Sequence, residues 1–456
     1  MQTLQTSHWL TGWKALGRLL VAVFGAWILV VTFAGCGGQP TNGKVHIQLS
    51  TWGSAQEVAV LKKLLQKFET AHPRIQVDLL HIPDNYYQKL QLLIAGDLTP
   101  DVMLTNSISF PIYASQGIFM DLQPLLSEKV SEKTGRDQAS DSEFSEFYPQ
   151  ALQAFTWRMQ TGKKILGALP RDISDVVIFY NRDLFKRAGL PEPASHWTWV
   201  QFLKATQTLT VDTNHDGDPD QFGFSFYAQP PLFWLPFVWS AGGDLFDANL
   251  QQVTLDQPAA LEGLQFYANL RNQEHVAPKK VESGGITMSQ LFLQQKIAML
   301  ISGRWSVPVL REQARFGWDV APFPIGPGGH SRVGIDASGY AVSAKTVHPQ
   351  ESLALVRFLL SAEAIRAVTV SGLIVPARRD VAESKEFLTP GQAPAHSRVF
   401  LDCIKEGSPT HTPPRWNEFS EELGLALEPV WDGKQTAAVA IRQAKPRLQH
   451  LLEVNP

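Results

Sequence analysis

The chain has 456 residues, of which 44% are hydrophobic and 18% are charged, and its formal net charge is -3. This length and composition are typical of a globular protein with more than one domain and exclude a fibrous or disordered chain. The sequence has no long block of Lys and Arg, which excludes the basic surface that nucleic-acid binding requires.

The first residues predict export. Lys14 and Arg18 precede an uncharged apolar run over residues 19–33, and small residues then lead to Cys36. A basic flank, a short apolar core and small residues are the pattern of a secretory signal peptide. The segment resembles the lipobox of bacterial lipoproteins, with Phe33 where Leu is usual, which implies lipidation of the Cys36 thiol. An uncleaved membrane anchor is the alternative.

We therefore interpret residues 1–36 as a lipoprotein signal peptide ending at the lipidated Cys36. Residues 37–44 contain Gly, Gln, Pro and Asn and are interpreted as a flexible tether. Cys403 is the only other cysteine in the sequence. An acylated Cys36 leaves no thiol pair for an intramolecular disulfide and no cysteine-based metal site.

Strand and helix patterns alternate after the tether. Residues 45–50 and 75–79 alternate apolar and polar side chains, and residues 100–104 read as a third strand. Ser54 and Glu57 have capping-box spacing at the start of the helix between the first two strands. A second helix, through Tyr87, Leu90 and Ile94, ends at Gly96. This order predicts a parallel, doubly wound α/β lobe with a ligand site at the carboxyl ends of its strands.

The later elements predict a second lobe. Residues 169–181 are typical of a strand that leaves the first lobe for the second. Further predicted helices cover residues 199–210, 258–272 and 353–360, and further predicted strands cover residues 296–301 and 340–343.

Five segments resemble the substrate-binding proteins of ABC importers, the family of the maltose-binding protein and its sugar-binding relatives. These segments are residues 50–54, 94–102, 180–185, 239–246 and 301–305. Each motif is short, but their order extends over residues 45–430, nearly the whole chain after the tether.

The resemblance implies a periplasmic-binding-protein-like α/β fold with two discontinuous lobes, joined by a hinge, and a ligand cleft between them. Lobe 1 would comprise residues 45–170 and about 335–375, and lobe 2 residues 171–334 and about 376–456. It also implies a lipid-anchored monomer outside the cytoplasm that closes by hinge motion. Its partners would be the transmembrane subunits of a permease, with a cytoplasmic ATPase, and the ligand would be a carbohydrate.

Sugars present hydroxyl groups and an apolar C–H face, so a sugar site needs aromatic rings beside polar side chains. The resemblance places Trp305 and Trp416 as stacking rings, with Asp336 and Tyr340 in a ligand-contacting loop. Paired glycines would let backbone amides approach the ligand. The predicted ligand-binding residues are Trp52, Ser54, Glu57, Asn106, Asp172, Trp239, Gly242, Gly243, Arg304, Trp305, Asp336, Tyr340 and Trp416.

Several alternatives stay open. Arg304 stands where the maltose-binding branch more often has Pro, and its guanidinium could bind phosphate, so glycerol-phosphate compounds or another anionic polyol are alternative ligands. A binder of peptides, metals or polyamines is a further alternative. A secreted glycoside hydrolase would need two opposed carboxylates, but no nucleophile elbow or zinc-type His pair is present. We therefore expect a binding protein and not an enzyme.

Residues 212–221 predict a calcium loop. Oxygen-bearing side chains at alternate positions, with Gly217 at the turn, match the first part of such a loop. Gly223 stands where the usual final Glu would be, so an acidic surface loop is the alternative. The predicted ligands are Asp212, Asn214, Asp216, Asp218, Asp220 and Gln221. This structural calcium ion is the only metal that we expect. We expect no cofactor.

Overall fold

The computed structural model describes residues 43–131, 145–159, 162–279, 282 and 284–453. Cys36, the predicted signal peptide and most of the predicted tether lie outside the described residues. No helix within the described ranges combines the length and the apolar character needed to cross a membrane.

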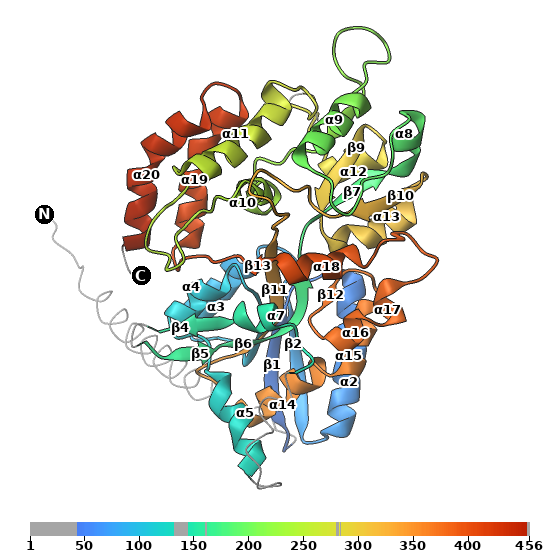
Figure 1. Ribbon diagram of the computed structural model, residues 1–456. Coiled ribbons are helices and arrows are strands. Elements are labelled where there is room, and N and C mark those ends of the chain that lie inside the picture. The colour runs from blue at the N-terminus through green and yellow to red at the C-terminus, as the bar shows by residue number, and fades with distance from the viewer. Residues whose placement is uncertain (1–42, 132–144, 160–161, 280–281, 283, 454–456) are drawn as a thin grey trace, which may run out of the picture. The chain divides into compact units, whose positions relative to one another are not determined.

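The first lobe is built on a seven-stranded sheet whose order is β12-β6-β11-β3-β1-β2, with β13 paired to β11. Its strands are β1 (Val45–Thr51), β2 (Ile75–His81), β3 (Val102–Asn106), β6 (Ala168–Ser174), β11 (Gly334–Val342), β12 (Val375–Pro376) and β13 (Ser408–Pro409). β1 and β3 run parallel, and β11 runs antiparallel to β3 and β6. Distant parts of the chain therefore share this sheet (Figure 1).

Helices cover the first sheet because each has an apolar face. α2 begins after Ser54, whose side chain accepts from the Glu57 amide, and Glu57 completes the predicted capping box. Its buried face runs from Val58 to Phe68. The helices of this lobe are α2 (Ala55–Ala71), α3 (Tyr86–Ala95), α4 (Phe110–Ser115), α5 (Leu122–Ser131), α7 (Pro149–Gln153), α14 (Pro349–Leu359), α15 (Ala362–Thr369), α16 (Arg379–Ala382) and α17 (Lys385–Leu388), with a hairpin of β4 (Thr156–Arg158) and β5 (Lys164–Leu166).

The second lobe has a four-stranded sheet in the order β10-β7-β9-β8. Its strands are β7 (Val177–Asn181), β8 (Phe222–Phe224), β9 (Ile297–Ser302) and β10 (Trp318–Ala321). All residues of these strands are buried, which explains their nearly continuous apolar sequences.

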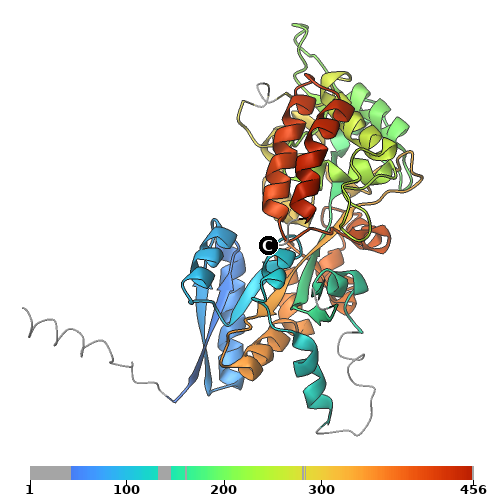
Figure 2. The same cartoon turned by 90° about the vertical axis from the view of Figure 1, so that its left-hand side faces the viewer.

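The helices of the second lobe and its border with the first are α8 (Arg182–Arg187), α9 (Trp199–Leu209), η2 (Pro231–Phe233), α10 (Leu235–Ser240), α11 (Pro258–Asn272), α12 (Met288–Leu293), η3 (Arg304–Ser306), α13 (Val307–Gln313), α18 (Val399–Glu406), α19 (Trp416–Trp431) and α20 (Ala437–Glu453). Figure 2 shows α19 and α20 side by side on this lobe.

The chain passes from the first lobe to the second at the segment where a crossing strand was predicted. β6 ends in the first sheet at Ser174, and β7 begins in the second sheet at Val177, so Asp175 and Val176 form the connection. The prediction of a two-lobed α/β fold is confirmed. The exact residue ranges assigned to the lobes stay a prediction, and β12, at residues 375–376, pairs with β6 in the first sheet.

Candidate ligand-binding site

Aromatic rings gather where β1 ends. Trp52 directly follows β1, and its ring meets Tyr86 edge-on at a centroid distance of 5.0 Å and lies 5.9 Å from Tyr87. Gly53 has a φ of 125°, a conformation that favours glycine, and it turns the chain from β1 into the cap of α2. Trp52 is partly exposed, so part of its ring is available to a ligand.

Polar groups lie beside these rings at the end of β3. The backbone amide of Asn106 donates to the Tyr87 hydroxyl at 2.9 Å, and the Asn106 side chain accepts from the Ser109 amide at 2.8 Å. Ser107 bonds to Ala337 of β11 through both its backbone amide and its hydroxyl. The end of β3 is thereby fixed to the middle of the sheet.

Asp336 belongs to the same edge. Burial raises the pKa of its carboxyl to about 7, and the hydroxyls of Thr410 and Ser107 partly offset this effect. Its Oδ1 has no hydrogen-bond partner within the described chain. We call Trp52, Tyr87, Asn106, Ser107 and Asp336 the carboxyl-edge site.

A small cavity lies next to Trp52 inside the first lobe. Glu57, Arg171 and Tyr340 line it together with apolar side chains. Its volume of about 20 Å³ holds about one water, so a larger ligand does not fit inside this cavity. The structure thus brings together three predicted site residues, Trp52, Glu57 and Tyr340.

Two predicted residues near this cavity already have partners. Asp172 is 2% exposed and accepts from Arg171 at 2.6 Å. Desolvation would lower the pKa of Arg171, but the charge and hydrogen bond of Asp172, together with Tyr340 and Glu57, outweigh it and raise that pKa. Ser54 is occupied by the cap of α2. The contacts of Asp172 and Ser54 within the protein therefore account for these polar side chains without a ligand.

A larger cavity of about 580 Å³ lies between the lobes beside β13. Trp239 lines it, donates to Asp244 at 2.8 Å and lies 5.4 Å from the guanidinium of Arg332, which pairs with Asp244 at 3.3 Å. Its lining includes α7 and residues 407–411, but not the carboxyl ends of β1, β3, β8 or β9. The cavity adjoins the carboxyl-edge site, because Thr410 in its lining interacts with Asp336 and a Cβ on Gly334 of β11 would lie 2.9 Å from the Trp239 ring. The role of Trp239 toward a ligand stays a prediction.

The expectation that Gly242 and Gly243 offer free amides is wrong. Their amides donate to the carbonyls of Trp239 and Val238 at the end of α10. A Cβ on Gly243 would lie 2.4 Å from Ala260 of α11, so close helix packing explains this glycine.

The expectation that Arg304 meets a ligand is also contradicted. Arg304 is 2% exposed, and its guanidinium donates to the carbonyls of Gly372 and Phe387 and to the hydroxyl of Ser397. A guanidinium with three protein partners has little left for a phosphate.

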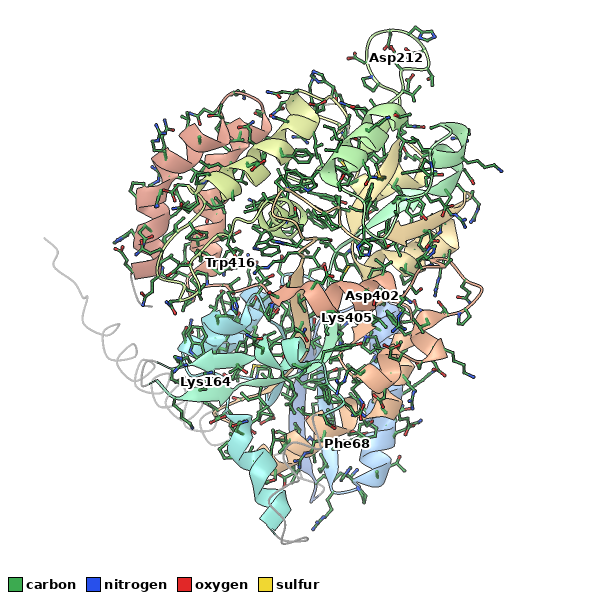
Figure 3. The ribbon with its side chains drawn as sticks, in the orientation of Figure 1. Phe68, Lys164, Asp212, Asp402, Lys405 and Trp416 are labelled. Atoms are coloured by element: carbon green, nitrogen blue, oxygen red, sulfur yellow. The ribbon has the colours of Figure 1, made fainter. Side chains whose placement is uncertain are left out.

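The other two predicted site tryptophans, Trp305 and Trp416, lie on the second lobe. Trp305 is partly exposed in η3, directly after the carboxyl end of β9. Trp416 is the first residue of α19 (Figure 3). It is 7% exposed, and its ring stacks on Phe419 at a centroid distance of 5.9 Å. Among the ring contacts of the described residues, none joins Trp305 or Trp416 to Trp52, so their role toward a ligand stays a prediction.

The predicted calcium loop lies at the edge of the second lobe, where Figure 3 places Asp212 away from Trp416. Its side chains accept hydrogen bonds from the loop's own amides: His215 and Gly217 donate to Asp212, and Thr213 donates to Asp220. No three Asp, Glu, His or Cys side chains in the described part of the chain gather as a metal site. Calcium binding stays a prediction.

Some residues of the candidate site were missed in the sequence. Tyr86 and Tyr87 follow the carboxyl end of β2, so the rule that selected Trp52 could have selected them. Arg171 is not among the predicted ligand-binding residues but lines the cavity beside Trp52. Asp244 and Arg332 are far apart in sequence, and no local pattern indicates that they pair.

The sequence profile of the bacterial extracellular solute-binding proteins matches residues 52–365. A binding protein of Brucella abortus is 20% identical over 417 residues, covering 90% of this chain and 94% of its own length. The multiple sugar-binding protein of Streptococcus mutans is 22% identical over 362 residues, covering 78% of this chain and 80% of that protein.

Solved structures show the same fold. An ABC substrate-binding protein of Listeria monocytogenes in complex with cycloalternan has a TM-score of 0.77 at 24% identity, covering 90% of this chain and 99% of that one. A Mycobacterium tuberculosis protein in complex with glycerophosphocholine has a TM-score of 0.73 at 19% identity, and the match covers 90% of this chain and 99% of that chain.

Proposed function

The chain belongs to the bacterial extracellular solute-binding proteins, and on this premise we propose that it captures a carbohydrate and delivers it to an ABC importer. The observation that carries the choice of ligand is the carboxyl-edge site, where the partly exposed Trp52 lies against two tyrosines, one of which accepts a hydrogen bond from the Asn106 amide. An aromatic face and adjacent amide, hydroxyl and carboxyl groups match the two surfaces of a sugar.

Binding would occur by closure of the lobes. The carboxyl-edge site is on the first lobe, and Trp305 follows the carboxyl end of β9 on the second lobe. Hinge rotation at the connecting segments would bring these surfaces over one ligand, and the closed form would dock on the permease. No step in this function makes or breaks a covalent bond.

We further propose that the protein is a lipid-anchored monomer outside the cytoplasm. The pattern before Cys36 supports cleavage and acylation there. Metabolic labelling of expressed protein with a radioactive fatty acid would test the anchor, with Cys36→Ser as the control that loses the label.

A neutral ligand is favoured over an anionic polyol. The anionic alternative depended on Arg304, whose donors are occupied by protein groups. Because the similar structure from Mycobacterium tuberculosis contains glycerophosphocholine, phosphorylated polyols are also included among the ligands to be tested.

The test is a thermal-shift screen of protein lacking residues 1–36 against neutral sugars, phosphorylated polyols, amino acids and metal ions. We expect stabilisation by a neutral oligosaccharide or disaccharide without turnover, because a ligand that binds only the folded state raises the melting temperature. Stabilisation by amino acids or metals alone would reject the carbohydrate assignment. Hydrolysis of a stabilising sugar would reject the assignment as a binding protein.

A further inference from the structure

Arg304 joins segments that belong to different lobes. It follows β9 of the second sheet, and its Nε donates to the Gly372 carbonyl at 3.1 Å while Nη2 donates to the Phe387 carbonyl at 3.0 Å. Nη1 donates to the Ser397 hydroxyl at 3.3 Å. One buried side chain therefore connects the exit of β9 to three other segments.

Two of these partners are attached to the first lobe. Gly372 lies just beyond α15, and Phe387 lies in the last turn of α17. α15 packs on α2 and on β12 of the first sheet, and α17 packs on α15 and α16. Carbonyls at or just beyond helix C-termini lack partners within the helix, so a guanidinium is well suited to bind them.

The third partner lies toward the second lobe. Ser397 follows His396, whose ring bonds to Asp319 of β10 at 2.8 Å. The Arg304 guanidinium also lies 4.4 Å from the centre of the Phe387 ring and 5.4 Å from that of Phe400. These ring faces exclude water and strengthen the three hydrogen bonds.

The hinge connection runs close to this guanidinium. Asp175, between β6 and β7, is fully buried, and neither of its carboxylate oxygens has a hydrogen-bond partner in another residue of the described chain. The charge of Arg304 partly offsets the effect of burial, which raises the Asp175 pKa. The charge of Arg304 thus acts on the segment that connects the two sheets.

We propose that Arg304 is an interlobe clamp that ties η3, and with it Trp305, to the ends of α15 and α17. The clamp limits rotation at the hinge and holds the Trp305 ring in position, so Arg304 is a positioning residue. Its effect on ligand affinity rests on the proposed function, whereas its effect on the lobes does not.

The first experiment measures the distance between the lobes without ligand. Spin labels are placed at Lys62→Cys on α2 and Lys204→Cys on α9, both exposed, in the full chain in detergent with Cys36→Ser. Cys403 is buried and should not react. We compare the native residue with Arg304→Met and Arg304→Lys; lysine keeps the charge but lacks the fork that reaches several acceptors at once.

The matched control is Arg271→Met. Arg271 is 8% exposed, donates to the Pro278 carbonyl and lies 3.6 Å from the centre of the Phe226 ring, all within the second lobe. We expect both Arg304 variants to broaden the distance distribution and the control to leave it unchanged. An unchanged distribution in folded Arg304→Lys, or equal broadening in Arg271→Met, would overturn the clamp.

The second experiment uses the sugar that stabilises the native protein most. We expect Arg304→Lys to raise its dissociation rate about tenfold, because a ring that is no longer held in place loses its contact with the ligand more easily. Equal dissociation rates would overturn the positioning of Trp305. If the native protein binds no sugar, the proposed function fails while the distance measurement still decides the clamp.

Discussion

The Trp52 ring meets the Tyr86 ring edge-on, with centroids 5.0 Å apart and an interplanar angle of 76°. Tyr86 is buried, and its hydroxyl bonds to Ser50 in β1 at 2.8 Å. This contact fixes the edge of the Trp52 ring while leaving part of the ring exposed. Because the ring is held before a ligand arrives, little conformational entropy would be lost on binding.

Replacing Trp52 with alanine should weaken binding of the stabilising sugar about tenfold, since the ligand loses an aromatic surface. Isothermal titration of both proteins would measure this difference. Trp157→Ala is the control, because Trp157 is also partly exposed but lies on the β4–β5 hairpin. Equal affinities for Trp52→Ala and the native chain would remove Trp52 from the site.

Replacing Trp305 with alanine should cost about 2 kcal/mol of binding free energy, as expected for an aromatic anchor that becomes buried when the ligand binds. Titration with the same sugar measures the loss. Val309→Ala, on the exposed side of α13, is the control for disturbance of this region. An unchanged dissociation constant would show that the ligand does not contact this ring.

Asp336 should make stability depend on pH. Its pKa is raised to about 7 by burial, so the folded state favours the protonated carboxyl. This contribution to the free energy of unfolding is complete below about pH 4, the range of an unfolded Asp, and is lost as the pH rises to about 7. Asp336→Asn removes this titration. The melting temperature of the variant minus that of the native chain should therefore be larger at about pH 8 than at about pH 5.

The control for this comparison is Asp84→Asn, because Asp84 is exposed before α3. Its pH dependence should follow that of the native protein. Parallel stability curves for Asp336→Asn and the native chain would show that this carboxyl does not titrate in that interval.

Calcium should stabilise the second lobe if residues 212–221 bind it. Addition of about 1 mM calcium should raise the melting temperature by about 2 °C or more relative to excess chelator, because the ion would bind only the folded loop. Asp212→Asn and Asp216→Asn should lose this rise. The absence of a calcium-dependent shift in the native chain would favour the acidic surface loop.

Local patterns predicted much of the fold because they arise from short-range physics. The capping box at Ser54 and Glu57 is an interaction between residues three apart, and α11 begins and ends at the predicted residues 258 and 272. By contrast, the late helices α19 and α20 were not predicted, although Trp416 was selected within that region. Each contains an internal proline, Pro429 and Pro446, which interrupts the usual helix pattern.

The amino-acid sequence by itself determined the alternating strands and helices, the carboxyl-edge position of Trp52 and the family resemblance, because periodicity and motif order are properties of neighbouring residues. Only the tertiary structure decided the roles of Arg304 and Gly243. Arg304 finds the carbonyls of Gly372 and Phe387, and Gly243 packs against Ala260, through contacts between segments distant in the chain. Whether a side chain faces a ligand or another part of the protein depends on such contacts, which no local pattern encodes.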